Sequence, residues 1–460
     1  MAKAMKKELT PEEKLEAALV PVEEWPYKVP KNWCWTRMSY LYAINPRNEA
    51  DDQTDAAFVP MEKISAGYSN DFEYEVQPWQ KAKRGHTQFA DGDVAFAKIS
   101  PCFENRKSMI VKGLPNGIGG GTTELIILRQ PMVEQKYTYW LVSTDKFIRG
   151  GCNTYSGTVG QQRISMDYVR NYMVPLPPLS EQHRIIESIE SLFAKLDEAK
   201  EAAQAVVDGF EDRKAAILHK AFTGELTAEW RLKNNVSFKL WQEVFLKDIV
   251  KGFKYGSSEK SDYNNEGLPV LRIPNIGEGK IDFSDMKYFS EPETDSSYYV
   301  HENDILIIRS NGSRDLVGKC ALVPRLDREY AYASFLIKVL PSTSVKPEFL
   351  VMYLNSIDAR RQMFAKAKSS AGIHNINSKE LGAISLLLPS IDEQEAVVKT
   401  VLKLIDSEIQ SLEIAEQVID QIDTMKKSIL ARAFRGELGT NDPNDEPAME
   451  LLKRVLDKKN

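Results

Sequence analysis

Two loops of this chain combine cationic side chains with short hydrogen-bonding ones. Each follows an apolar run that begins at an aspartate, Asp93 or Asp304. Arginine can hold a guanine edge with two hydrogen bonds, and lysine, serine and asparagine anchor phosphates or base edges. A solvated, turn-rich loop is an equally good interpretation of this composition. The candidate contacts are Lys98, Ser100, Asn105, Arg106 and Lys107 in the first loop, and Arg309, Ser310, Asn311, Ser313 and Arg314 in the second.

Three further segments carry the same kinds of side chain. The basic, aromatic loop 251–260 offers Lys254, Ser257, Ser258 and Lys260 for DNA contact, with an ordinary surface loop as an even alternative. Gln162 and Arg163 precede the last predicted strand of one globular part, and His374 and Asn375 precede that of the other. For these four residues a structural turn is somewhat favoured over a DNA contact.

The sequence contains no recognisable catalytic or metal-binding pattern. There is no G-x-x-x-x-G-K-[ST], H-E-x-x-H or G-x-S-x-G. The glycine-rich run 117–122 precedes an apolar strand, whereas a nucleotide loop precedes a helix, so a tight turn is favoured. The four cysteines are scattered, which argues against zinc and disulfides and predicts a reducing cytoplasm. We expect a non-catalytic protein with no catalytic residues, metal or cofactor, and no membrane span, because no apolar run approaches ~18 residues.

The elements that must position these loops are duplicated. Glu181-Gln182 opens a long helical pattern that closes at Leu226, and Glu393-Gln394 opens a second that closes at Leu438. The offset of 212 residues holds without a gap from Gln182 and Gln394 to Leu226 and Leu438. Because solenoid units run ~20–50 residues, this period indicates a duplicated domain followed each time by a long helix.

The long helices carry apolar residues in alternating steps of four and three, which is typical of a coiled-coil seam. In the second helix Glu408 and Ser411 interrupt that frame. Two such stripes are expected to pack on each other, antiparallel if a two-fold axis relates the repeats, with a globular part at each end as in a dumbbell. The seam residues are Ile185, Ile189, Leu192, Leu196, Val206, Phe210, Ile217, Val401, Leu404, Val418, Ile422 and Ile429.

The predicted fold class is α+β, with two globular parts, each a curved mixed sheet with helices. Strands are expected at 93–98, 124–128, 304–309 and 334–339, and a capped helix at 10–19. The globular parts carry small positive charge, with 17 basic and 15 acidic residues in 31–180 and 22 and 20 in 227–390. Each helical segment has 6 basic and 10 acidic residues, so the overall charge of −6 does not exclude DNA. The domain boundaries are an N-terminal tail with a short helix at 1–30, globular parts at 31–178 and 227–390, long helices at 179–226 and 391–438, and a C-terminal tail at 439–460.

At these motifs the chain resembles the specificity subunits of type I restriction-modification systems. The resemblance rests on the repeated Glu-Gln at the start of each long helix, the closing F-x-G-E-L, and the run Pro175–Gln182. The segments 92–105, 121–124 and 268–276, which include Arg272 as a further candidate DNA contact, resemble parts of their target recognition domains. The resemblance covers residues 31–438, and its motifs occur in the order expected for that family.

The resemblance implies two target recognition domains, each reading one half of a split, asymmetric site in double-stranded DNA. The helices would separate them and dock two modification subunits, which bring S-adenosylmethionine and adenine methylation, while restriction subunits add ATP-driven translocation and cleavage. The alternative function is a non-catalytic, dumbbell-shaped scaffold with two protein-binding domains and no DNA role. A third, an enzyme with a cryptic site, is disfavoured by the missing motifs.

Overall fold

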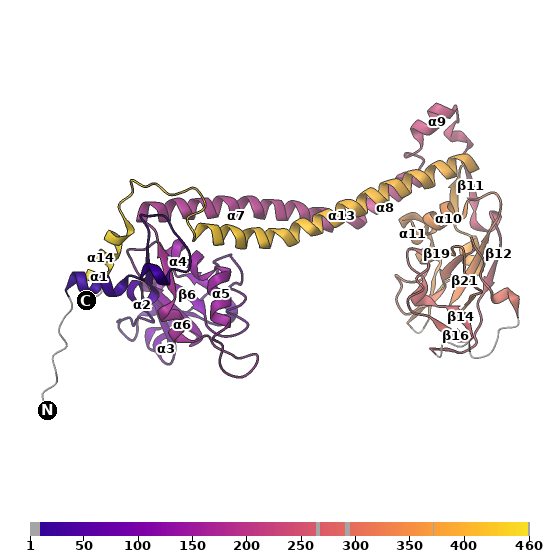
Figure 1. The fold of residues 1–460 in the computed structure, drawn as a ribbon. Helices are drawn as coiled ribbons and strands as arrows, with labels where there is room; N and C mark the ends of the chain where they lie inside the picture. Colours follow the sequence, from indigo (N-terminus) through magenta and orange to yellow (C-terminus); the bar gives the residue numbers. More distant parts are fainter. Residues whose placement is uncertain (1–9, 264–266, 290–294, 371, 459–460) are drawn as a thin grey trace. The chain divides into compact units, whose positions relative to one another are not determined.

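The computed structural model describes residues 10–263, 267–289, 295–370 and 372–458. Residues 1–9 of the N-terminal tail and 459–460 of the C-terminal tail lie outside the described residues. The chain divides into two units. The first comprises the residues up to Ala202 and those from Val418 onward, and the second comprises Ala203–Gln417. The long helices α7 (Leu179–Asp208) and α13 (Ile391–Ala433) therefore contribute residues to both units (Figure 1).

The first unit distributes its strands over three small sheets, where the sequence predicted one. They have the orders β1-β10, β2-β9-β6-β7 and β4-β3-β8-β5, and β3 runs parallel to β8. The strands are β1 (Cys34–Arg37), β2 (Ala43–Ile44), β3 (Asp55–Val59), β4 (Glu75–Pro78), β5 (Thr87–Ala90), β6 (Val94–Ala97), β7 (Ser108–Ile110), β8 (Ile118–Gly121), β9 (Leu125–Arg129) and β10 (Met173–Leu176). The helices besides α7 are α1 (Pro11–Ala18), α2 (Met38–Leu41), α3 (Trp79–Lys83), α4 (Gln135–Val142), α5 (Asp145–Cys152), α6 (Met166–Asn171) and α14 (Ala448–Lys458).

In the residues that the structure describes, the second unit has four sheets. Their orders are β11-β24, β12-β21-β17-β19-β15, β13-β16-β14-β20 and β18-β23-β22. The strands are β11 (Gln242–Phe245), β12 (Val250–Tyr255), β13 (Ser261–Asp262), β14 (Leu268–Leu271), β15 (Gly279–Lys280), β16 (Lys287–Phe289), β17 (Ile305–Ile308), β18 (Ser310–Asn311), β19 (Cys320–Leu322), β20 (Ala331–Tyr332), β21 (Leu336–Pro341), β22 (Lys368–Ser370), β23 (Ile373–Asn375) and β24 (Ser385–Leu388). The helices besides α13 are α8 (Phe210–Phe222), α9 (Ala228–Asn234), α10 (Pro347–Asn355), α11 (Ile357–Lys366) and α12 (Ser378–Gly382).

The predicted α+β class is confirmed, and the strands predicted at 93–98, 124–128, 304–309 and 334–339 correspond to β6, β9, β17 and β21. Strands β6 and β17 are apolar throughout because both of their faces are covered. Val94 and Phe96 point into one core and Ala95 into another. In β17, Ile305 and Ile307 point into one core, and Leu306 and Ile308 point into another. Successive side chains of a strand alternate between faces, so these strands form rigid supports for the loops that follow them.

The prediction of a tight turn at 117–122 is wrong, because Gly119–Gly121 belong to β8, between β3 and β5. A Cβ at Gly120 would lie 2.0 Å from the carbonyl oxygen of Ala82 in α3, and one at Gly121 would lie 2.6 Å from that of Val59. Glycine is needed here because backbone from neighbouring elements packs directly on the strand.

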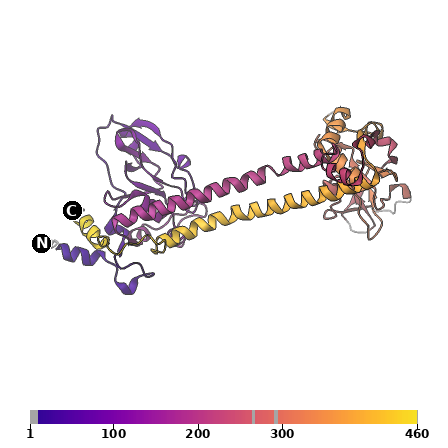
Figure 2. The same cartoon turned by 90° about the horizontal axis from the view of Figure 1, so that it is seen from above.

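In the first unit, α7 runs antiparallel to the C-terminal part of α13. Glu181 lies near Thr440 and Asn441, whereas Asp197 pairs with Lys426. Figure 1 shows the two helices side by side, and Figure 2 shows the same arrangement from above. The buried apolar residues of α7 here are Ile185, Ile186, Ile189 and Phe193, which join the core of the unit.

The prediction that Leu192 lies in the seam between the helices is wrong. Its side chain is 37% exposed, whereas the neighbouring Phe193 is 5% exposed and packs against Tyr68 and Trp140. The buried face of α7 is thus determined by its contacts with the globular part, and it departs from an ideal coiled-coil pattern. Of the other predicted seam residues, Ile185, Ile189, Val401 and Ile422 are buried, and Leu196, Val206, Phe210, Ile217, Leu404, Val418 and Ile429 are partly buried.

In the second unit, the first long helical segment is interrupted at Gly209, which separates α7 from α8. Glu408, the residue that breaks the apolar frame of α13, forms an ion pair of 2.6 Å with Arg213 of α8. Arg213 also donates to the carbonyl of Val206 at 2.8 Å. The polar interruption is therefore a cross-helix contact. None of the helices in the described residues is long and apolar enough to cross a membrane.

Candidate nucleic-acid interface

The loops predicted after β6 and β17 are held in the same way in the two units. Lys98 and Arg309 are the first residues after these strands. The Lys98 N–H donates to the carbonyl of Glu124 at 2.8 Å, and its carbonyl accepts from Ile164 at 3.0 Å. The Arg309 N–H donates to the carbonyl of Phe335 at 2.9 Å, and its carbonyl accepts from Ile376 at 2.9 Å. Each loop is thus joined by backbone hydrogen bonds to the segment that follows it in the predicted interface. This segment carries Gln162 and Arg163 in the first unit, and His374 and Asn375 in the second.

In the second unit, backbone pairing brings four of the predicted residues into one small sheet. Ser310 is opposite Asn375, and Asn311 is opposite His374, in the antiparallel pair β18–β23. The Asn375 Oδ1 is buried and has no hydrogen-bond partner among the described residues. Buried polar atoms are nearly always partnered. An acceptor without a partner is therefore an exception, and this oxygen can still accept a hydrogen bond.

Arg309 lies beside this sheet, with its guanidinium 4.7 Å from the ring centroid of Tyr255 at the end of β12. The Arg309 Nε, like Asn375 Oδ1, is buried and without a hydrogen-bond partner in the described part of the chain. A guanidinium stacked on an aromatic ring leaves its terminal N–H groups in the ring-parallel plane, where they can meet an acceptor such as a base edge. Tyr255 and the exposed Phe335 are members of this surface that the sequence analysis did not select.

The other predicted residues of the second unit differ in accessibility. Lys254, Ser258 and Lys260 are exposed, whereas Ser257 is buried in the sheet connection and its N–H donates to the Tyr332 carbonyl. Ser313 and Arg314 are exposed, and the Arg314 guanidinium lies 5.1 Å from the Phe364 ring centroid on α11.

Arg272 is held inside its own unit. It donates to the carbonyl of Asp285 at 3.0 Å and pairs with the carboxylate of the same residue at 3.1 Å. Its side chain is 17% exposed, so it supports the fold of this region rather than projecting from it.

In the first unit, Gln162 and Arg163 adjoin the Lys98 loop. The Ser100 N–H donates to the Gln162 carbonyl at 2.8 Å. The Arg163 guanidinium makes two hydrogen bonds to Glu124, of 2.9 and 2.8 Å. This pairing lowers the pKa of Glu124 through hydrogen bonding to Arg163. The charge of Arg163 is therefore already neutralised within the unit.

The remaining residues of the first loop stabilise it internally. Arg106 donates to the Ser143 carbonyl at 3.0 Å and pairs with Asp145. Lys107 donates to the Met61 carbonyl at 2.9 Å. The Ser100 hydroxyl donates to Glu104 at 3.0 Å, and the Asn105 side chain is exposed. Lys98 and Asn105, together with Gln162, are thus the residues of this group with free polar surface.

The repeated Glu-Gln motif forms a second, buried polar site at the start of each long helix. Glu181 is fully buried and accepts from Trp33 Nε1 and Asn441 Nδ2, both at 2.7 Å. Gln182 accepts from the Glu134 N–H at 3.0 Å and donates to the Pro177 carbonyl at 3.1 Å. The motif therefore joins the helix start to the strand before it and to the C-terminal segment.

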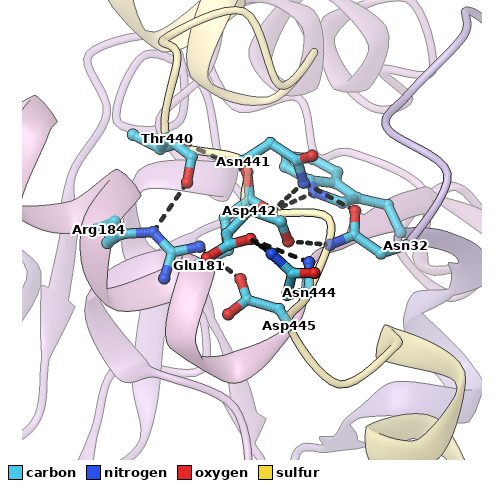
Figure 3. A network of polar contacts seen from close by, with 9 residues as sticks. Asn32, Glu181, Arg184, Thr440, Asn441, Asp442, Asn444 and Asp445 are labelled. Carbon is cyan, nitrogen blue, oxygen red and sulfur yellow. Dashed lines mark hydrogen bonds and ion pairs between the residues drawn. The ribbon is translucent and has the colours of Figure 1, made fainter.

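Figure 3 shows this network from close by. Arg184, one turn further along α7, donates to the Thr440 carbonyl at 2.8 Å and pairs with Asp445. That pairing lowers the pKa of Asp445. Asn441 also donates to the Asn32 side chain at 2.7 Å, so three separate parts of the chain meet here.

Glu393 is the equivalent buried carboxylate of the second unit. It accepts from Trp241 Nε1 at 2.9 Å and from the Thr227 hydroxyl at 2.8 Å. Arg231 supplies a cation at 2.6 Å, whereas the Glu181 carboxylate is surrounded by neutral donors. Gln394 accepts from the Lys346 N–H at 2.7 Å and donates to the Pro389 carbonyl at 3.0 Å, as Gln182 does in the first unit.

Comparison with known proteins gives one family. The model of the "type I restriction modification DNA specificity domain" matches residues 123–206 and 239–422, more than half of the chain. The specificity subunit of the type I restriction enzyme EcoAI from Escherichia coli is 36% identical over 199 residues, which are 43% of this chain and 34% of that protein. The EcoKI specificity subunit of strain K12 is 29% identical over 271 residues, 58% of this chain and 57% of that protein.

A solved structure shares the fold. The crystal structure of the HsdS subunit from Thermoanaerobacter tengcongensis superimposes with a TM-score of 0.66 at 19% identity. The match covers 91% of this chain and all of that one. Since the identity is low, this likeness concerns the fold alone.

Proposed function

The chain belongs to the type I restriction-modification DNA specificity family, and on that premise we propose that it reads a bipartite, asymmetric DNA site with one surface in each unit. The first surface contains Lys98, Asn105 and Gln162, and the second contains Arg309, Asn311, His374 and Asn375. Each unit reads one half of the site. Methyl transfer and cleavage belong to partner subunits, and this chain is their non-catalytic guide.

The observation that carries this proposal is the position of the Arg309 guanidinium, which is stacked on the Tyr255 ring next to the strand pair that carries Asn311, His374 and Asn375. The Arg309 Nε and the Asn375 Oδ1 are buried and have no partner among the described residues. Arginine and asparagine are the side chains that hold guanine and adenine edges with paired hydrogen bonds. The repeated backbone bonds at Lys98 and Arg309 support an equivalent role for both loops.

We also propose that the helical parts dock modification subunits, which in turn recruit restriction subunits. Support comes from apolar side chains left exposed on α13 within the second unit, namely Leu402, Ile409 and Ile414. Leu402 and Ile409 lie seven residues apart and therefore on the same face of the helix, and a contiguous exposed apolar face is typical of a protein interaction site.

The test is a binding measurement on a mapped motif. Methylated positions in the source genome define the candidate site. The full chain with its modification subunits is then titrated with DNA that carries this motif and with the same DNA after scrambling of either half. We expect each scrambled half to weaken binding by a factor of at least 10³, which is the lower range for specific over non-specific binding. Equal affinity for all three DNAs would favour the scaffold function without a DNA role.

A further inference from the structure

The second unit contains a pocket that is lined largely by aromatic rings. Its volume is about 360 Å³, near the lower end of the range for small-ligand sites, ~300–1,000 Å³. The aromatic residues that line it are Tyr263, Phe283, Tyr288 and Tyr330. Tyr288 and Tyr330 are buried, whereas Tyr263 is 61% exposed and Phe283 is 37% exposed. Two rings are therefore fixed in the core, and two are accessible to a ligand.

The sheet beside the pocket does not require these rings for its own packing. Strand β16 pairs antiparallel with β14, which pairs parallel with β20. In the first unit, β4 pairs antiparallel with β3, which pairs parallel with β8. Tyr288 lies in β16 and Tyr330 directly precedes β20, whereas β4 and β8 contain no aromatic residue. The matching sheet thus forms without aromatic residues in these strands, so the tyrosines at these places are specific to the second unit.

Two cations lie against the rings of the pocket. The Lys287 Nζ is 4.7 Å from the ring centroid of Tyr263, and the Arg328 guanidinium is 5.5 Å from that of Tyr330. Neither cation has an ion-pair partner among the residues that the structure describes. The pocket therefore combines aromatic faces with positive charge, which suits a ligand that has both a flat ring and a negative charge.

The pocket and the candidate interface lie at the same end of the sheet β13-β16-β14-β20. Asp285, which lines the pocket, pairs at 3.1 Å with Arg272, the residue that follows β14. The N–H of Ala333, which follows β20, donates to the last carbonyl of β14 at 2.9 Å. Two residues later, the Phe335 carbonyl accepts from the Arg309 N–H. A short series of contacts therefore connects the pocket with the candidate DNA-reading loop.

We propose that this pocket binds one unstacked nucleotide of the DNA in the second half-site. Bases of any kind stack on aromatic side chains, and arginine and lysine hold phosphates. The base lies against Tyr263 and Phe283, and Arg328 and Lys287 hold the phosphate.

The proposed function explains why such a nucleotide arises. An enzyme that modifies a base in duplex DNA takes that base out of the stack, so the nucleotide opposite it loses its pairing partner. The inference rests on the proposed function, and it adds a site for the nucleotide that is left unpaired while a partner subunit acts on the other strand.

The test combines removal of a base from the DNA with removal of an aromatic ring from the pocket. Each nucleotide of the mapped second half-site is replaced in turn by an abasic analogue. Dissociation constants are measured for the full chain with its modification subunits, for Tyr263→Ala and for Phe283→Ala. Phe245→Ala is the matched control, because Phe245 is 46% exposed on β11 of the same unit, outside the pocket.

We expect Tyr263→Ala and Phe283→Ala to weaken binding of the intact DNA by about 5- to 150-fold, the range for one base stacked on an aromatic side chain. One abasic position should weaken binding of the unmodified chain by a similar factor, and on that DNA the two variants should cause no further loss. Phe245→Ala should retain the full effect of the abasic position. Arg328→Gln should make the salt dependence of binding shallower by ~0.9, the value for one phosphate contact.

Additive losses at every abasic position, or variants that bind the intact DNA as tightly as the unmodified chain does, would overturn the inference. If a free nucleoside monophosphate binds the complex but not its Tyr263→Ala variant, and losses on DNA are additive, the pocket is a site for a soluble nucleotide instead. These outcomes leave the preference for the mapped motif over scrambled DNA intact, whereas failure of the proposed function abolishes that preference itself.

Discussion

Arg163 and Arg309, two of the arginines predicted to contact DNA, have different partners, and this determines what each can contribute. Arg163 is held by two hydrogen bonds to Glu124, whereas Arg309 is stacked on Tyr255 with an unpartnered Nε among the described residues. The net positive charge of a loop is therefore a poor guide to its contacts with DNA. Whether a cation can contact DNA depends on whether it is already paired within the protein.

Arg309→Ala should weaken specific binding by ~1–3 kcal/mol and relax base preference in the second half-site only. The matched control is Arg314→Ala, because Arg314 is an exposed arginine of the same loop that lies on Phe364 of α11. We expect this control to leave the base preference unchanged. Dissociation constants on DNA with single-base changes in each half-site measure both effects. An equal loss on all sequences would assign Arg309 to a phosphate.

Glu124→Gln should release Arg163 from its ion pair. A freed guanidinium that reaches a phosphate displaces about one more counterion, so the salt dependence of DNA binding should steepen by ~0.9. The double variant Glu124→Gln, Arg163→Gln should return the slope to its original value. A slope that does not change in the single variant would place Arg163 away from the DNA backbone.

At the residue scale the sequence predicted the loops but not the state of their side chains. Composition and position after an apolar strand were enough to select Lys98 and Arg309. The partners of Arg106 and Lys107, Asp145 and the Met61 carbonyl, lie 39 and 46 positions away in the chain. Such contacts depend on the tertiary fold, which spacing alone does not contain.

The helical elements show the same limit. Steps of four and three located the apolar face, but Leu192 is exposed and Phe193 is buried, because α7 packs on Trp140 and Tyr68 as well as on α13. The prediction missed this because a coiled-coil frame assumes a single helical partner.

Substitutions on α7 test the corrected packing. Ile189→Asp buries an unpaired carboxylate and should cost several kcal/mol of folding free energy. Leu192→Asp, three residues further along, should cost less than about 1 kcal/mol because its side chain reaches solvent. Chemical denaturation followed by circular dichroism measures both. Equal costs would mean that Leu192 is buried in solution.

The two buried glutamates offer a second matched pair at this scale. Glu393→Gln removes the partner of the buried Arg231 and should destabilise the second unit by ~3–5 kcal/mol. Glu181→Gln replaces a carboxylate that has only neutral donors, and should cost ~1–2 kcal/mol. Denaturation curves resolved by probes in each unit provide the comparison. A larger cost for Glu181→Gln would contradict the role assigned to Arg231.

On the scale of the whole molecule, the duplication is visible in sequence and structure alike. The Glu-Gln motif occupies the same buried position in each unit, with Trp33 or Trp241 as donor. The offset of 212 residues located these motifs without a structure, because the glutamate and glutamine at the centre of each network are the same in both repeats. It did not reveal that the C-terminal segment from Thr440 onward closes the first network, since the second is closed by Thr227 and Arg231.

Strands β1 and β10 give the first globular part a natural exchange boundary. Cys34 is paired with Leu176, so the two ends of residues 31–178 lie on adjacent strands. A relative's equivalent segment can therefore be inserted with little change to the helices, provided that it retains the apolar residues that contact α7 and Phe434.

Exchange of residues 31–178 followed by methylation mapping tests the central claim that each unit reads one half-site independently. We expect the first half of the methylated motif to become that of the donor, while the second half and its base preferences stay as they were. A motif in which both halves change together, or in which neither changes, would contradict the assignment of one DNA-reading surface to each unit.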